Sequence, residues 1–167
     1  MTTYTSTMDT PVGPFTAVVD GDGAVLASGW TADVEALLPL IHRDLREGTP
    51  ASKKDLGAVS RAVREYHEGQ LSAPDAITVR QQNGVFLTAA WKTLRDVAPG
   101  QPVSYAELAI RAGNGAAVRA AAQACARNAA ALFVPCHRVV RADGSIGGFR
   151  WGPDTKHWLL DHEAPGL

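Results

Sequence analysis

The chain has 167 residues and a formal net charge of −1 at pH 7, and 46% of its residues are hydrophobic while 20% are charged. This balance supports a packed core, so it excludes a disordered chain and predicts one domain or two small ones. No apolar run approaches the ~18 residues that a membrane helix needs, and the N-terminus does not resemble a secretory signal. Two cysteines, Cys125 and Cys136, are too few for a disulfide framework. Reduced thiols are typical of the cytosol, so we expect a cytoplasmic protein.

Charge is distributed unevenly along the chain. Residues 1–83 carry 7 basic and 11 acidic side chains, whereas residues 84–167 carry 9 and 6. Between Arg111 and Arg150 there are six arginines and one acid, Asp143. This local excess predicts a polyanionic partner such as a nucleic acid, and the alternative is a solvated arginine face.

The first 80 residues show the pattern of a small α/β domain. Asp20–Gly23 is a tight turn between two apolar, strand-like runs, which is typical of a β-hairpin. The predicted elements are strands over 15–19, 24–30 and 77–80 and helices over 32–47 and 56–68. We expect no chemistry in this part, with His42 and His67 as ordinary surface or boundary histidines.

From residue 84 the pattern becomes helical. Ser104 and Glu107 have the spacing of a capping box, which marks the start of a helix. The glycines of 113–115 form a tight turn before the next helix. The predicted helices cover 86–97, 105–112, 116–127 and 154–163. Helix, short turn and helix in succession is the helix-turn-helix pattern of many DNA-binding proteins.

The helix predicted over 116–127 consists mostly of alanine. Its larger polar residues are Arg119, Gln123 and Arg127, which share one side because they are four positions apart. A small-residue surface with one projecting arginine fits the minor groove of DNA, read with little sequence preference. The alternative is that the alanines pack against the protein core.

A cysteine directly precedes a histidine in an apolar setting. Residues 129–134 and 139–140 flank the pair, so the thiol of Cys136 is predicted to be buried or half-buried. A neighbouring imidazole such as that of His137 can help a thiol react as the thiolate. Glu163, near the end of the last predicted helix, could pack back towards His137. The alternatives are an ordinary buried cysteine and a solvent-exposed terminal glutamate.

Together these motifs resemble those of the O6-alkylguanine-DNA alkyltransferases, a family of direct-reversal DNA repair proteins. Order and spacing match over residues 86–163. The residues that carry the resemblance are Ser104–Ala109, Arg119, Ala120, Asn128, Pro135–Val139, Gly147–Gly152, Leu159, Leu160 and Glu163. The resemblance implies an α/β (α+β) chain with an N-terminal sheet-plus-helix, RNase H-like domain over residues 1–80. It also implies a C-terminal winged helix-turn-helix-like catalytic domain over residues 84–167.

The resemblance implies a catalytic role for four residues. Cys136 would accept the alkyl group, and His137 would remove the thiol proton through a bridging water. Glu163 would orient His137. Tyr105 would donate a hydrogen bond to the departing guanine and help to turn the nucleotide out of the helix. The thioether product is not cleaved, so each molecule would react once, and we expect no metal and no cofactor.

The resemblance also implies a DNA surface and a base pocket. Arg119 would fill the space left by the flipped base. The other residues expected at the DNA are Ser104, Ala117, Ala122 and Gln123. The residues expected around the guanine are Asn128, Val139, Phe149, Arg150 and Trp151. The expected partner is double-stranded DNA bearing O6-alkylguanine, with O4-alkylthymine as a further candidate, and we expect a monomer.

Five positions depart from the usual pattern of the family. Ala129 and Ala131 stand where proline is frequent, Phe149 where tyrosine is usual, Ala122 where glycine is common, and Leu87 where glutamine is frequent. These changes bear on the reaction rate and the range of alkyl groups, and none removes the chemistry. Two other functions stay open at this point: a non-catalytic helix-turn-helix module in which Cys136 is structural, and a Cys–His hydrolase or acyl transferase.

Overall fold

The computed structural model describes residues 2–165. Their contacts divide the chain into two compact units, one of residues up to 82 together with 129–133, the other of 83–128 together with residues from 134 onward. The segment 129–133 therefore belongs to the first unit, although it lies within the predicted second domain. Among the described residues, no helix is long and apolar enough to cross a membrane.

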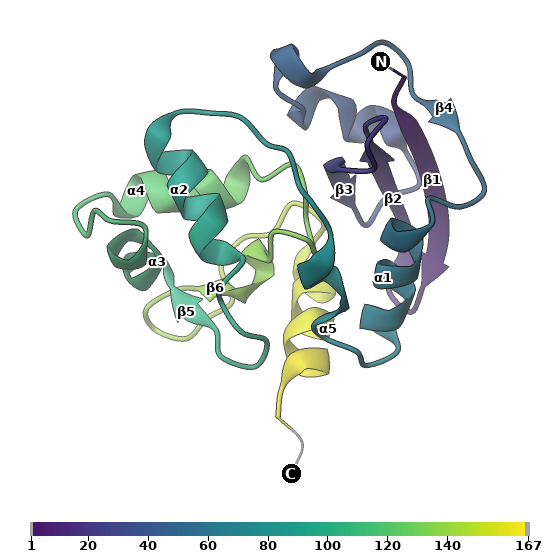
Figure 1. The fold of residues 1–167 in the computed structure, drawn as a ribbon. Coiled ribbons are helices and arrows are strands. Elements are labelled where there is room, and N and C mark those ends of the chain that lie inside the picture. Colours follow the sequence, from purple (N-terminus) through teal and green to yellow (C-terminus); the bar gives the residue numbers. More distant parts are fainter. Residues whose placement is uncertain (1, 166–167) are drawn as a thin grey trace. The chain divides into compact units, whose positions relative to one another are not determined.

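A four-stranded sheet forms the centre of the first unit, in the order β3-β2-β1-β4 (Figure 1). Its strands are β1 (Tyr4–Thr10), β2 (Gly13–Val19), β3 (Val25–Gly29) and β4 (Ala51–Ser52). The first three are antiparallel, and β4 pairs in parallel with β1. The predicted hairpin is confirmed as β2 and β3, and the Asp20 carboxylate accepts hydrogen bonds from two backbone amides of its turn. Strand β1 was missing from the prediction because its threonines and serines show no apolar alternation.

The helix predicted over residues 32–47 is wrong. Three short 3₁₀ turns replace it: η1 (Val34–Ala36), η2 (Leu38–Leu40) and η3 (Arg43–Leu45). Pro39 explains the break, because proline lacks the N–H that a helix interior requires and its ring clashes with the preceding turn. The Arg46 guanidinium donates to the carbonyls of Ile41 (2.7 Å) and Pro39 (2.9 Å), which holds the turns together.

The remaining elements of the first unit are helical. The predicted helix over 56–68 is confirmed as α1 (Ala58–His67), which lies against the sheet (Figure 1), and η4 (Ala73–Ala76) follows it. The strand predicted over 77–80 is reduced to a single bridge between Val25 and Val79.

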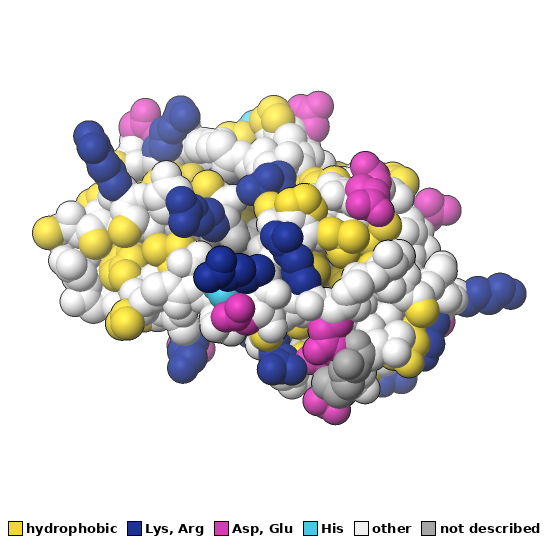
Figure 2. All heavy atoms as spheres, turned by 90° about the horizontal axis from the view of Figure 1, so that it is seen from above, with side chains coloured by type: hydrophobic (Ala, Val, Ile, Leu, Met, Phe, Trp, Pro, Cys, Tyr) yellow, Lys and Arg dark blue, Asp and Glu magenta, His cyan; other side chains and the backbone are white. Residues whose placement is uncertain are grey.

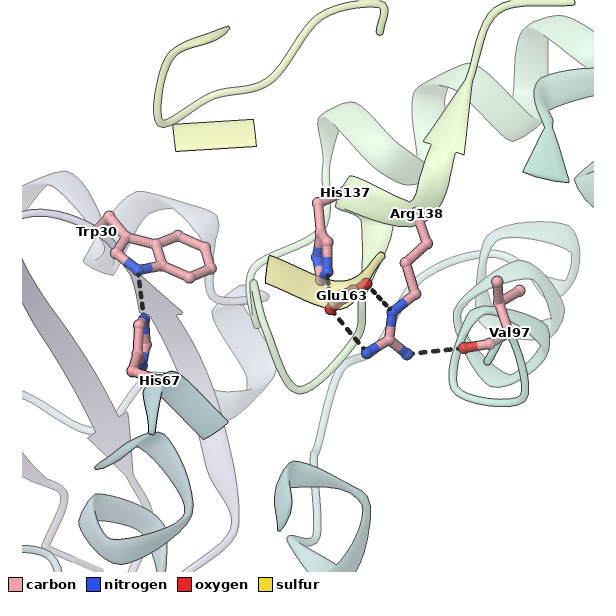
Figure 3. Close-up of polar contacts among 6 residues, drawn as sticks. All are labelled: Trp30, His67, Val97, His137, Arg138 and Glu163. Atoms are coloured by element: carbon pink, nitrogen blue, oxygen red, sulfur yellow. Dashed lines mark hydrogen bonds and ion pairs between the residues drawn. The ribbon is translucent and has the colours of Figure 1, made fainter. Parts of the chain in front are cut away.

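The expectation of a surface histidine is wrong for His67. This side chain is buried in the first unit, where Trp30 Nε1 donates to its Nε2 at 3.2 Å (Figure 3). Its Nδ1 therefore carries the proton and donates to the carbonyl of Val63 at 2.7 Å. His67 is a satisfied core residue, since both ring nitrogens have partners.

The second unit is mainly helical, as predicted. Its elements are α2 (Val85–Leu94), β5 (Val103–Ser104), α3 (Tyr105–Arg111), α4 (Val118–Ala126), η5 (Cys136–Arg138), β6 (Val139–Val140) and α5 (Pro153–Glu163). The helices α2, α3 and α4 pack together, and Trp91 on α2 donates to the carbonyl of Ala124 on α4 at 2.9 Å. Strands β5 and β6 pair in parallel, which brings the start of α3 beside the Cys136 turn.

Half of the predicted capping box forms at the start of α3. The Ser104 hydroxyl accepts from the backbone amide of Glu107 at 3.0 Å, as expected for an N-cap. The Glu107 carboxylate instead pairs with Arg111 one turn later, also at 3.0 Å. The cap fixes where α3 begins and so places Tyr105 at its first position.

Candidate active site

Asn128 fixes the approach of the chain to Cys136. Its buried side-chain amide donates to the carbonyl of Val134 at 2.8 Å and to Cys136 Sγ at 3.2 Å. The segment between them contains Leu132 with φ 78°, a left-handed conformation that a branched side chain rarely adopts. Within the first unit, Ser28 holds this segment by donating from its hydroxyl to the carbonyl of Ala131 at 2.7 Å. A strained turn that is tied down in this way is typical of functional sites.

Cys136 is buried, with 8% of its surface exposed. Burial raises the pKa of its thiol, because the thiolate would lose its hydration. The hydrogen bond from Asn128 and the positive charge of Lys156 act in the opposite direction. The structure therefore surrounds a protonated thiol with groups that stabilise its ionised form.

Glu163 joins His137 and Arg138 in a buried network (Figure 3). Its Oε2 lies 2.7 Å from His137 Nε2, and Arg138 donates to both carboxylate oxygens at 2.9 and 3.0 Å. Arg138 also donates to the carbonyl of Val97 at 2.7 Å. Burial alone would raise the pKa of Glu163, but the hydrogen bonds and charges of His137 and Arg138 outweigh it and hold this pKa at about 2. Glu163 is therefore an anion, and the alternative of a solvent-exposed glutamate is excluded.

The Glu163 carboxylate determines the tautomer of His137. Burial lowers the pKa of this fully buried imidazole, so the ring is neutral at pH 7 although Glu163 favours its charged form. A neutral imidazole carries one proton, and an acceptor-only carboxylate at Nε2 requires that proton to be there. Nδ1 is then a bare acceptor, and it is buried without a hydrogen-bond partner among the described residues. A neutral imidazole with a free lone pair can act as a general base, and His137 directly follows the thiol of Cys136 in the sequence.

Lys156 is a site residue that the sequence prediction missed. Its side chain is fully buried, and its ammonium group donates to the carbonyls of Val139 (2.7 Å) and Gly148 (3.2 Å). Burial lowers the pKa of Lys156, and the two cysteines oppose this shift. A signal was available, because Lys156 shares one face of α5 with the buried Leu159 and with Glu163. Arg138, quoted only as part of a motif, is the second missed participant.

Tyr105 and Cys125 lie within electrostatic reach of Cys136. Burial raises the pKa of Tyr105, and the charges of ionised Cys125 and Cys136 raise it further. Burial and Cys136 likewise raise the pKa of Cys125. The loop after β6 lies close to Tyr105 at Gly147 (φ +72°), where an added Cβ would be only 2.9 Å from the tyrosine hydroxyl. A residue other than glycine could not occupy this position without moving the loop or the tyrosine.

The alanine-rich helix α4 has two different faces. Ala121 and Ala124 are fully buried, so part of the alanine content serves packing. The predicted DNA-contacting residues Arg119, Ala122 and Gln123 are exposed on the other face, while Ala117 and Ser104 are partly exposed. In Figure 2, the part of the surface on the side of α2–α4 carries Lys and Arg side chains set among hydrophobic and uncharged ones.

The remaining predicted pocket residues lie on β6 and the loop before α5. Val139 is buried, Phe149 and Trp151 are partly exposed, and Arg150 is exposed. Arg150 donates to the carbonyl of Ala126 at 2.6 Å, which ties this loop to the end of α4. Among residues 2–165, no group of three or more His, Cys, Asp or Glu side chains could hold a metal ion.

Comparison with known proteins identifies the family. The family model for the DNA binding domain of 6-O-methylguanine DNA methyltransferase matches residues 85–165. A methylated-DNA--protein-cysteine methyltransferase from Shigella flexneri is 35% identical over 157 residues, which cover 93% of this chain and 92% of the relative. A methylated-DNA--protein-cysteine methyltransferase from Rattus norvegicus is 45% identical over 87 residues, 52% of this chain and 42% of the relative.

Solved structures agree with this result. The crystal structure of Mycobacterium tuberculosis OGT in complex with DNA superposes with a TM-score of 0.81 at 25% identity, covering 97% of this chain and 95% of that one. The chain therefore belongs to the methylated-DNA--protein-cysteine methyltransferase family, and the expected α/β fold is confirmed.

Proposed function

We propose that this protein repairs O6-alkylguanine in duplex DNA by transferring the alkyl group to its own Cys136, once per molecule. The observation that carries the proposal is the buried hydrogen bond between Glu163 and His137, which leaves Nδ1 of His137 without a proton. His137 directly follows the thiol-bearing Cys136 in the sequence. A structural cysteine would not require such an arrangement. The family assignment supports the same reaction.

The reaction is a displacement at the alkyl carbon. The thiol proton of Cys136 passes to His137 Nδ1 through a water molecule, and Glu163 stabilises the imidazolium that forms. Sulfur then attacks the alkyl carbon, an S–C bond forms, and the O6–C bond breaks with its electron pair going to the guanine. The guanine takes up, through water, the proton that His137 had received, so it becomes normal guanine and the imidazole returns to its neutral form. The thioether of Cys136 remains, so the protein is consumed.

The surroundings of the thiol stabilise both charges that develop. Lys156 and the amide of Asn128 stabilise the thiolate, because both lower the pKa of Cys136. Tyr105 serves the leaving group: its pKa is raised, so its hydroxyl keeps the proton and can donate it in a hydrogen bond to the guanine ring. No step requires a metal ion or a cofactor.

A thiol this deeply buried can meet its substrate only if the base leaves the DNA helix. The exposed face of α4 is suited to a minor groove, because Ala122 and Ala126 allow close approach and Arg119 is exposed at the start of the same face. Arg119 would fill the gap in the base stack, with Ser104, Ala117 and Gln123 along the backbone. A damaged pair is weaker than a normal one, so base flipping itself favours alkylated guanine.

The flipped guanine would be read by the residues around η5 and the following loop. The carbonyls of Cys136 and Val139 face its amino group, the amide of Arg150 approaches O6, and Phe149 and Trp151 form the walls. We further propose that residues 1–80 and 84–167 act as two domains of a cytoplasmic monomer. The free thiols of both cysteines are consistent with a reducing compartment.

The test is an incubation with duplex DNA that carries a labelled methyl group on guanine O6. We expect the label to move to the protein up to about one equivalent, and we expect Cys136→Ala to abolish transfer while Cys125→Ala retains it. Repeated turnover would refute the proposal, and so would label that stays on the DNA. Hydrolysis of a thioester would point instead to the hydrolase alternative.

A second experiment tests the DNA contact. Arg119→Ala should slow repair of duplex DNA far more than it slows reaction with free O6-alkylguanine, because only the duplex requires base flipping. The matched control is Arg61→Ala, an exposed arginine on α1, which should change neither rate. Equal losses on duplex and free base would contradict the proposed role of Arg119.

A further inference from the structure

The first unit holds the five residues that lead towards the active-site cysteine. Residues 129–133 are each at most 2% exposed, and they run beside β3, where Ala130 forms a parallel bridge with Ser28. The backbone amide of Ser28 donates to the carbonyl of Ala129 at 2.8 Å. Its hydroxyl donates to the carbonyl of Ala131 at 2.7 Å. One serine therefore holds the segment at two points.

A glutamine side chain supplies a third point of attachment. The backbone amide of Ala129 donates to Gln81 Oε1 at 3.0 Å. Gln81 is half-buried and lies 48 positions earlier in the chain than Ala129. Ala129 directly follows Asn128, whose side-chain amide donates to Cys136 Sγ at 3.2 Å. The bond to Gln81 thus fixes the backbone next to the residue that holds the reacting sulfur.

The segment requires this support because its backbone is strained. Leu132 has φ 78°, a left-handed conformation that is costly for a residue with a bulky side chain. Such a conformation persists only where the surrounding contacts impose it. If the bonds to Ala129 and Ala131 were lost, Leu132 could relax, and Val134 would move with it. The carbonyl of Val134 is the second acceptor of the Asn128 amide, at 2.8 Å.

We propose that Gln81 is a positioning residue for the proposed alkyl transfer, which holds the 129–133 segment so that Asn128 stays bonded to Cys136. The inference rests on the proposed function. It gives the first unit a part in a reaction whose acceptor cysteine and base, His137, belong to the second unit. Gln81 acts through the backbone, and its effect can be large because a misplacement of ~1 Å can cost ~10²-fold in rate.

The test replaces Gln81, because a half-buried side chain can be changed without emptying the core. Gln81→Met keeps the length of the side chain and removes the acceptor. We expect the single-turnover rate constant at saturating duplex DNA with O6-methylguanine to fall roughly 2–10-fold, the range of one hydrogen bond, with unchanged duplex affinity. Gln81→Glu keeps an acceptor oxygen at the same reach and should restore the rate. Gln82→Met is the matched control, because Gln82 is exposed, and it should change neither quantity.

The pH profile of transfer separates positioning from a loss of stability. The Asn128 bond lowers the pKa of Cys136, so loosening it should shift the profile of Gln81→Met to higher pH. The charges of Lys156 and Arg150 also lower this pKa, and the variant leaves both in place. The double variant Gln81→Met/Asn128→Ala should be no slower than Asn128→Ala alone, because both changes act through one hydrogen bond.

Two results would overturn the proposal. One is a Gln81→Met protein that is less stable to urea yet transfers with the rate and pH profile of the unmodified protein, since the bond would then serve the fold alone. The other is a double variant in which the two losses multiply. If Gln81→Met fails to fold, Gln81→Asn, which withdraws the acceptor by one methylene, is judged by the same measurements.

The unmodified protein distinguishes the two levels of the argument. If it transfers no alkyl group to Cys136, the proposed function is refuted and this inference with it. If it transfers normally and Gln81→Met does the same, only the positioning role of Gln81 is refuted.

Discussion

Replacing Glu163 by glutamine perturbs both the stability and the chemistry of the site. The carboxylate accepts from His137 and, twice, from Arg138, and its side chain is 1% exposed. Glutamine keeps the shape but offers one acceptor and one donor. Either Arg138 or His137 must then face an N–H group, and the buried arginine loses its counterion.

The size of the effect follows from the burial of this network. Removing one partner of a buried ion pair costs about 3–5 kcal/mol, and because glutamine keeps one acceptor we expect about 3 kcal/mol. For a chain of this length, that loss corresponds to a fall in Tm of roughly 6–12 °C. If the amide N–H faces His137 Nε2, the imidazole proton moves to Nδ1 and the base is lost. The transfer rate should therefore fall by about 10²–10⁴-fold, the usual contribution of general base catalysis.

Urea unfolding and single-turnover alkyl transfer measure the two effects separately. Glu107→Gln is the matched control, because its ion pair with Arg111 is on the surface, with both side chains nearly half exposed. It should change stability by no more than ~0.5 kcal/mol and leave the transfer rate unchanged. The reasoning is refuted if Glu163→Gln unfolds and transfers as the unmodified protein does.

Three further outcomes are expected. The pKa of Glu163 falls from 4.5 to about 2 on folding, so its contribution of about 3 kcal/mol to the free energy of unfolding is complete above pH 4.5 and is lost as the pH falls towards 2. Urea unfolding measured between about pH 2 and pH 5 checks this, and Glu163→Gln should not show this loss of stability. Lys156→Met should slow alkylation of Cys136 about tenfold and shift its pH profile to higher pH, and it should cost about 1–3 kcal/mol of stability because the carbonyls of Val139 and Gly148 lose their lysine donor. Lys92→Met is the exposed control, and an unchanged pH profile would contradict the role of Lys156. Asn128→Ala should destabilise the protein by about 1–3 kcal/mol, as measured by urea unfolding, because it removes two buried hydrogen bonds, to the carbonyl of Val134 and to Cys136 Sγ; a smaller loss than in an exposed asparagine variant such as Asn114→Ala would refute this.

Local signals in the sequence predicted much of the fold. The turn at Asp20–Gly23 predicted the β2–β3 hairpin, and Ser104 predicted the first residue of α3. Both features depend on hydrogen bonds between near neighbours in the chain, so a short stretch of sequence determines them. The apolar runs around Cys136 likewise predicted its burial.

The failures have a different origin. The apolar spacing over residues 32–47 fits a helix, but one residue, Pro39, prevents it, and periodicity alone does not weigh a single breaker. Strand β1 lacks an apolar pattern and is stabilised by pairing on both of its edges. His67 looked like a helix-surface residue, and only the position of Trp30, far away in the chain, shows that it is core.

In the site, the sequence indicated the residues that react and missed two that support them, Lys156 and Arg138. The contact between His137 and Glu163 joins residues 26 positions apart. The residues alone indicate it only as one of two alternatives, and the resemblance to the family is what implies the pair. Lys156 was missed because a fully buried lysine is rare and the expectation for a helical lysine is solvent exposure. Arg138 was missed because a buried arginine is equally rare.

The most direct test of the central claim is the mass of the intact protein after reaction with duplex DNA carrying O6-methylguanine, followed by peptide mapping. We predict a gain of one methylene per chain, at the peptide that contains Cys136 and not at the one that contains Cys125, with unmodified guanine left in the DNA. An unchanged protein mass, or a methyl group found on Cys125, would contradict the account.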